Sequence, residues 1–182
     1  MDKITSYSMK HIQWVQENPL LALYKINKEI PMIQQKENLK ATGKVRIVKT
    51  NAQGVTTQDF EVPNLVVTSG KNFIASSMIK TTTNSPAAMT HMGIGTGSST
   101  PGASDTTLGT QTGRVSLSGN TVSTNTITYT ASFPAGTGDG AITEAAIFNA
   151  SSGGTMLCRT TFPVVTKGSG DTIAVTWVVT VS

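Results

Sequence analysis

The sequence predicts a mainly β fold: an antiparallel β-sandwich or jelly roll with one short helix, preceded by an extended, partly helical N-terminal arm. Only 13% of the 182 residues are charged and 5% are aromatic, whereas Ser, Thr and Gly are abundant. That composition suits short strands joined by tight turns. From Gly43 onward, apolar residues recur with a period of two, which indicates half-buried strands. Glycine-rich turns separate these runs at the spacing of a sandwich.

The sequence predicts an N-terminal arm over residues 1–42 and the β-sandwich domain over residues 43–182. The arm is rich in Lys, Gln, Asn and Ile and is interrupted by Pro19 and Pro31. Asn18 followed by Pro19 is typical of a helix start, because Asn caps free amides and Pro suits the first helical position. A helix ending at Pro31 is too short to persist alone in water. We therefore expect the arm to bind a partner through its apolar side chains, which are Trp14, Leu20, Leu23, Tyr24, Ile26 and Ile30.

Net charge is also unevenly distributed along the chain. Residues 1–50 hold nine Lys/Arg against four Asp/Glu, a net of +5, and residues 51–182 hold five against six, a net of −1. A nucleic-acid-binding domain would concentrate basic residues on its folded part. Docking of the basic arm onto an acidic protein surface is the favoured interpretation, and no nucleic-acid partner is expected.

The first strands form a predicted hairpin. Val45 and Ile47 share one face, residues 51–54 turn, and residues 55–62 return to Pro63. Residues 64–68 then extend. Residues 70–80 predict a short helix with Phe73, Ile74 and Met78 facing inward.

The later strands have the clearest alternation. Residues 126–133 and 172–181 each place every second side chain inward, and strands are also expected within 115–117, 142–148 and 156–162. A final strand that runs to the terminus normally lies inside a sheet. The predicted core includes the aromatic residues Tyr129, Phe133, Phe148, Phe162 and Trp177.

Several motifs invite a functional interpretation that their context does not support. Gly93-Ile94-Gly95-Thr96-Gly97 resembles a phosphate-binding loop, but a loop follows it rather than a helix with a Lys-Ser/Thr pair, so a strand with a closely packed glycine edge is favoured. His11 and His91 have no Cys or carboxylate at metal-ligand spacing. A serine triad could recruit only His91, inside an apolar strand. We expect no catalytic residue, no metal site and no cofactor.

The remaining chemically active residues are expected to be structural. Asp139 and Asp171 lie in glycine-rich turns and could belong to calcium loops, but each offers a single carboxylate, so turn formation is favoured. Glu144 is flanked by apolar residues and is expected to pair with Arg159 or Arg114. Cys158, the single cysteine, is interpreted as a small buried apolar residue. No segment is long and apolar enough to suggest secretion or membrane insertion.

Residues 91–182 resemble a module of tailed-bacteriophage virion proteins of the tail-fibre, collar or head-decoration type. The residues that carry the resemblance are Gly93 to Gly97, Thr100-Pro101, 105–108, 128–133, 142–149, 154–162, Lys167 and 171–177. The resemblance extends weakly to residues 62–70. It implies a non-catalytic virion building block that is usually oligomeric and commonly trimeric. Residues 1–42 lie outside the pattern.

We therefore expect a virion structural protein, assembled in the host cytoplasm, that anchors by its arm and oligomerises through its sandwich. Its partners would be itself, as a homotrimer, and other virion proteins of the capsid, the tail or the portal. The alternative is a carbohydrate- or receptor-binding module whose partner is a host surface glycan. A hydrolase in an unfamiliar fold is the third hypothesis, and the residue inventory gives it no support.

Overall fold

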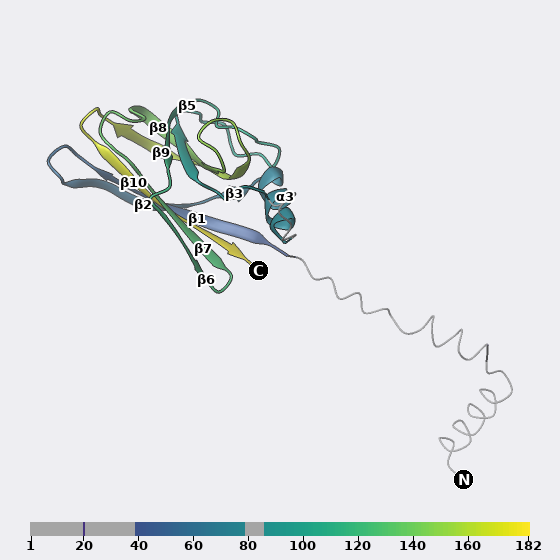
Figure 1. The fold of residues 1–182 in the computed structure, drawn as a ribbon. Coiled ribbons are helices and arrows are strands. Elements are labelled where there is room, and N and C mark those ends of the chain that lie inside the picture. Colours follow the sequence, from purple (N-terminus) through teal and green to yellow (C-terminus); the bar gives the residue numbers. More distant parts are fainter. Residues whose placement is uncertain (1–19, 21–38, 79–85) are drawn as a thin grey trace, which may run out of the picture. The chain divides into compact units, whose positions relative to one another are not determined.

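The computed structural model describes residues 20, 39–78 and 86–182. Residues 39–78 and 86–182 fold into two antiparallel five-stranded sheets and one short helix (Figure 1). The mainly β prediction is confirmed. Sheet A has the order β2-β1-β10-β7-β6 and sheet B the order β3-β9-β8-β4-β5. Sheet A comprises β1 (Ala41–Thr50), β2 (Thr56–Pro63), β6 (Gly119–Ser123), β7 (Thr126–Phe133) and β10 (Thr172–Val181). Sheet B comprises β3 (Leu65–Val66), β4 (His91–Gly95), β5 (Gln111–Ser116), β8 (Gly140–Phe148) and β9 (Met156–Lys167).

The last strand, β10, lies at the centre of sheet A, as its strong alternation predicts. It pairs with β1 on one side and β7 on the other, so that Val45, Trp177 and Tyr129 lie in register across three strands. Lys40 and Ser182 exchange two backbone hydrogen bonds beside these strands. Strand β1 thus begins two residues before Gly43, the predicted start of the domain.

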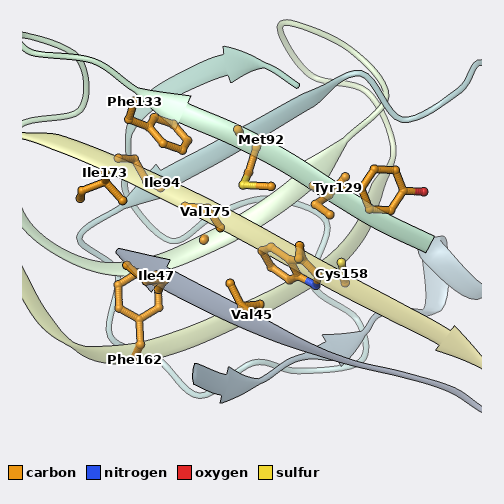
Figure 2. Close-up of a cluster of buried hydrophobic side chains, with 14 of the residues drawn as sticks. Val45, Ile47, Met92, Ile94, Tyr129, Phe133, Cys158, Phe162, Ile173 and Val175 are labelled. Carbon is orange, nitrogen blue, oxygen red and sulfur yellow. The ribbon is translucent and has the colours of Figure 1, made fainter. Parts of the chain in front are cut away.

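The core lies between the two sheets, and Figure 2 shows it from the side of β10. Val45, Ile47, Phe133 and Trp177 from sheet A are essentially inaccessible to solvent and pack in one cluster with Met92, Ile94 and Ile147 from sheet B. All five aromatic residues predicted for the core are buried. Phe148 belongs instead to a second cluster, with Val67, Leu108, Ala146 and Met156.

Local sequence explains the first hairpin. The side chain of Asn51 accepts hydrogen bonds from the amides of Gln53 and Val55, and Gly54 adopts φ +79°, a conformation that side-chain-bearing residues avoid. The predicted turn and returning strand are confirmed.

The helix α3 spans Thr68–Ser77, two residues earlier than predicted at its start. Phe73 and Ile74 pack against the core as expected. The prediction that Met78 faces inward is wrong: Met78 follows the helix and its side chain is 78% exposed. Gly70 occupies a position where a Cβ would collide with the backbone of Leu157, so the helix lies directly on β9.

Strand β6 has no counterpart among the strands expected from the sequence, because its exposed residues lack apolar alternation. The predicted arm residues Trp14, Leu23, Tyr24, Ile26 and Ile30 lie outside the described residues. Leu20, which is described, is helical and exposed.

Candidate functional site

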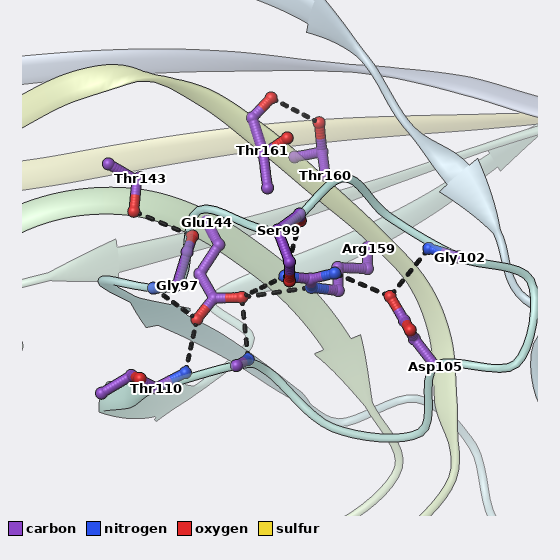
Figure 3. Close-up of polar contacts among 11 residues, drawn as sticks. Gly97, Ser99, Gly102, Asp105, Thr110, Thr143, Glu144, Arg159, Thr160 and Thr161 are labelled. Carbon is purple, nitrogen blue, oxygen red and sulfur yellow. Dashed lines mark hydrogen bonds and ion pairs between the residues drawn. The ribbon is translucent and has the colours of Figure 1, made fainter.

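The largest concentration of buried charge is a cluster formed by Glu144 of β8, Arg159 of β9 and Asp105 of the connection between β4 and β5 (Figure 3). The side chain of Glu144 is fully buried and that of Arg159 is 2% exposed. Neighbouring strands bring the first two together, because β8 and β9 pair with Ala146 opposite Arg159. We call these three residues the Glu144 cluster.

Glu144 accepts hydrogen bonds at both carboxylate oxygens. The amides of Gly97 and Thr110 donate to Oε1 at 2.9 and 2.8 Å, and the amide of Gly109 donates to Oε2 at 3.0 Å. Arg159 also donates to Oε2, from Nε at 3.1 Å and from Nη2 at 2.8 Å. A buried carboxylate is costly unless it is paired and hydrogen-bonded, and Glu144 meets both conditions.

Arg159 links strands β8 and β9 to residues 96–110, the connection between β4 and β5 that we call the 96–110 connection. Its Nη1 donates to Asp105 Oδ2 at 2.7 Å, and its Nη2 donates to the carbonyl and hydroxyl oxygens of Ser99 at 3.2 Å. Asp105 Oδ2 also accepts the amide of Gly102 at 2.9 Å. The Glu144 cluster therefore fixes a fifteen-residue connection that has no regular secondary structure of its own. Loops of that length are commonly functional or mobile, and this one is anchored at five separate residues.

The glycine-rich motif at residues 93–97 does bind an anion through a backbone amide, but the anion is the chain's own Glu144. A Cβ at Gly97 would collide with the Glu144 carboxylate, and a Cβ at Gly95 would collide with the Thr110 carbonyl. The predicted closely packed glycine edge is confirmed. Of the two partners expected for Glu144, Arg159 forms the ion pair. Arg114 instead lies over the Phe148 ring, with its Cζ 3.6 Å from the ring centroid.

Hydrogen bonding lowers the pKa of both acids in the cluster. Burial would raise the pKa of Glu144, but the amides of Thr110 and Gly109, the Arg159 guanidinium and the Gly97 amide together bring it below its ordinary value of 4.5. The Gly102 amide and then Arg159 lower the pKa of Asp105 below 3.8. Both groups are thus held as carboxylates in the folded chain.

A lowered pKa in the folded state predicts acid sensitivity. The stabilisation is complete above the unfolded-state pKa values of 4.5 and 3.8 and is lost as pH falls through the lower folded values. We expect urea titrations to give a constant free energy of unfolding from about pH 7 to about pH 5.5 and a steep decline below about pH 4.5. The Glu144→Gln variant should show a shallower decline. An equal slope in the two proteins would assign the acid sensitivity to other groups.

All six carboxylates of residues 39–78 and 86–182 form ion pairs. Besides the Glu144 cluster, the pairs are Lys44–Glu61, Arg46–Asp59, Lys49–Asp171 and Lys167–Asp139. Asp171 also accepts the amide of Gly168, which confirms its turn-forming role. The sequence predicts a turn-forming role for Asp139 as well, but its described contact is an ion pair of 2.6 Å with the buried Lys167.

The described aromatic residues and the cysteine are packed inside the domain. Phe133, Phe148 and Trp177 are fully buried, Tyr129 and Phe162 are nearly so, and Phe60 and Phe73 are half-buried. Burial raises the pKa of Tyr129 to about 12. Cys158 is buried as predicted, and burial raises the pKa of its thiol well above the ordinary value, which disfavours the reactive thiolate.

The two sheets differ in how their outer faces are covered. On sheet B, Leu108 of the 96–110 connection packs with Phe148 and Met156. On sheet A, the outward residues of β6, β7 and β10 are all exposed or half-buried. They form an uncharged surface, which we call the neutral face: Thr121, Ser123, Thr126, Thr128, Thr130, Ser132, Ala174, Thr176, Val178 and Thr180.

The neutral face is the candidate interaction surface of the domain. Cross-strand register places Thr128 between Val178 and Thr121, and Thr130 beside Thr176. The three strands contain no Lys, Arg, Asp or Glu. Depletion of charge characterises the centre of protein interfaces. The adjoining β1 and β2 carry the exposed Lys44–Glu61 and Arg46–Asp59 pairs, which would form a polar rim.

Within the described part of the chain, no three His, Cys, Asp or Glu side chains gather as a metal site would require, and no helix is long and apolar enough to cross a bilayer. Comparison with protein-family models, curated proteins and solved structures finds no match to this chain.

Proposed function

We propose that this chain is a non-enzymatic structural protein of a bacteriophage virion, assembled in the host cytoplasm, that anchors by its N-terminal arm and self-associates through its β-sandwich. Its virion partners would be capsid, tail or portal proteins. The virion assignment is supported by the sequence resemblance. The resemblance implies a homotrimer.

The observation that supports self-association is the uncharged surface of the neutral face. Ten outward residues on three adjacent strands lack charge, and their threonine and valine side chains can pack against a partner without desolvating ions. A structural role also accords with the ion pairs, because each of the six described carboxylates is paired with a basic side chain of the same chain.

The glycan-binding alternative is disfavoured. Such modules present aromatic rings to the sugar, whereas the seven aromatic residues of the described ranges are buried or half-buried. The sandwich therefore has no exposed aromatic platform among those residues.

Deleting the arm provides the test of anchoring. Because Lys40 bonds to Ser182 and β1 begins at Ala41, the truncation should remove residues 1–38 and retain these contacts. We expect the truncated chain to keep the melting transition of the sandwich but to be missing from virions assembled in its presence. Residues 1–38 hold five Lys/Arg against four Asp/Glu, a net of +1, so capture of the full chain by particles that lack it should depend only weakly on salt.

The matched control replaces the six predicted anchoring residues of the arm with serine and leaves its charge unchanged. Loss of incorporation in both variants would assign anchoring to the apolar contacts. Normal incorporation of the chain lacking residues 1–38 would contradict the proposal that the arm is the anchor.

Mass measurement of the full chain by light scattering tests self-association, and a monomer at high micromolar concentration would contradict it.

A further inference from the structure

The four edge strands of the sandwich are not equally protected against pairing with another chain. Unpaired strand edges are blocked in natural proteins by charges, proline, bulges, short length or covering segments. Strand β2 carries Asp59, Glu61 and Pro63, and its pairing with β1 shifts register at Lys49/Thr50. Strand β3 has only two residues.

Strand β5 is also protected. Its pairing with β4 shifts register at Ile94/Gly95. The turn at residues 136–140 packs onto it, since a Cβ at Gly113 would lie 2.9 Å from the Cα of Gly138. Arg114 adds a charged side chain whose Nη1 donates to the carbonyls of Ala150 and Gly153.

Among residues 39–78 and 86–182, none of these devices protects strand β6. Its sequence, Gly-Asn-Thr-Val-Ser, contains no charge and no proline, and its register with β7 is regular from Gly119 to Ser123. Val122 is 72% exposed, and the strand continues the neutral face. In a two-strand pairing, alternate N–H and C=O groups point away from the partner, so the outer side of β6 is a template for another strand.

We propose that β6 is a strand-addition edge at which β6 of a second copy of this chain pairs antiparallel, joining the two A sheets into one. The inference rests on the proposed self-association and adds to it an edge contact that does not itself bury the neutral face. A second copy fits the edge because both strands are uncharged and meet without like-charge repulsion. The new pair would also repeat the antiparallel arrangement that every strand pair of the sandwich already has.

A twofold axis at Thr121 matches the two strands over their whole length. Gly119 then faces Ser123 of the other copy, Asn120 faces Val122, and Thr121 faces its own equivalent. Such a contact is isologous, with the same residues contributed by both chains. Since the axis is perpendicular to the sheet, the neutral faces of the two copies lie on the same side and form one continuous surface. The contact predicts a dimer rather than the trimer that the resemblance implies.

Cysteine cross-linking of the full chain tests this register. Directly opposed residues of antiparallel strands have Cβ atoms about 4.5–5.5 Å apart, close to the separation that a disulfide needs. Thr121→Cys should therefore give a covalent dimer under mild oxidation, and the buried native Cys158 contributes little background. Thr57→Cys, on the exposed edge strand β2 of the same sheet, is the matched control and should stay largely uncross-linked.

Lysine substitution at the same two positions tests the association without a covalent bond. In sedimentation equilibrium, Thr121→Lys should weaken dimerisation about tenfold or more, because two ammonium groups would meet at the axis. Thr57→Lys should leave it unchanged. Equal melting temperatures of the two variants would exclude misfolding as the cause.

The outcomes separate this inference from the function on which it rests. An oligomer that neither cross-links at Thr121 nor responds to Thr121→Lys would overturn the β6 contact and leave self-association standing. Binding of β6 only to a different protein would also overturn it. A monomeric full chain at every concentration would overturn both.

Discussion

Trp177→Ala is expected to lower the free energy of unfolding by about 3 to 5 kcal/mol, a large part of the stability of a domain of this size. Trp177 lies on the central strand of sheet A, opposite Val45 on one side and Tyr129 on the other, and has no solvent exposure. Truncation leaves a cavity in the middle of the core that the paired strands cannot close. Urea denaturation of the two proteins measures the difference, and the melting temperature should fall by on the order of 10 °C.

Trp177→Phe is the control that separates the loss of ring volume from the loss of the indole N–H. The indole Nε1 is buried and has no hydrogen-bond partner among the described residues, so replacement by phenyl removes a polar group that the core does not satisfy. We expect Trp177→Phe to cost clearly less than Trp177→Ala. If Trp177→Ala shifts the melting temperature by only a degree or two, the ring is exposed in solution and the glycan-binding alternative regains support.

The alternating strands could be predicted because each has one buried and one exposed face. Tyr129, Ala131 and Phe133 on β7, and Val175, Trp177 and Val179 on β10, are buried at every second position, and this burial imposes the period of two. Strand β6 could not be predicted, because this pattern of burial is missing from it. It lies at an edge, Asn120 through Ser123 are all exposed, and no burial selects apolar residues at alternate positions.

The Glu144 cluster could be predicted only in part. A glutamate within an apolar strand requires a cation, and Arg159 is one of the few arginines of the chain. The three amides that complete the carboxylate belong to Gly97, Gly109 and Thr110, which lie 34 to 47 residues away in sequence. Backbone donors carry no residue-type signal. Of the 93–97 motif, Gly95 and Gly97 make room for the carboxylate and so record the contact in the sequence.

The second large effect is expected at Arg159. Arg159→Met should lower the free energy of unfolding by about 3 to 5 kcal/mol, because it leaves Glu144 charged, buried and without its counterion. Methionine preserves most of the apolar volume, so the loss is electrostatic. Asp105 and Ser99 lose their contacts at the same time, and the 96–110 connection should open locally. Hydrogen exchange at the amides of Gly97, Gly109 and Thr110 should accelerate more than exchange in β10.

Two comparisons isolate the pair. Lys44→Met breaks the exposed ion pair with Glu61 and should cost no more than about 1 kcal/mol, since solvent screens exposed pairs. Adding Glu144→Gln to Arg159→Met removes the stranded charge, so the double variant should be more stable than the sum of the single changes predicts, by a coupling of about 1 to 3 kcal/mol. Strict additivity, with a cost for Arg159→Met as small as that for Lys44→Met, would mean that the 96–110 connection is held by packing of Leu108 on Phe148 and not by the buried charges.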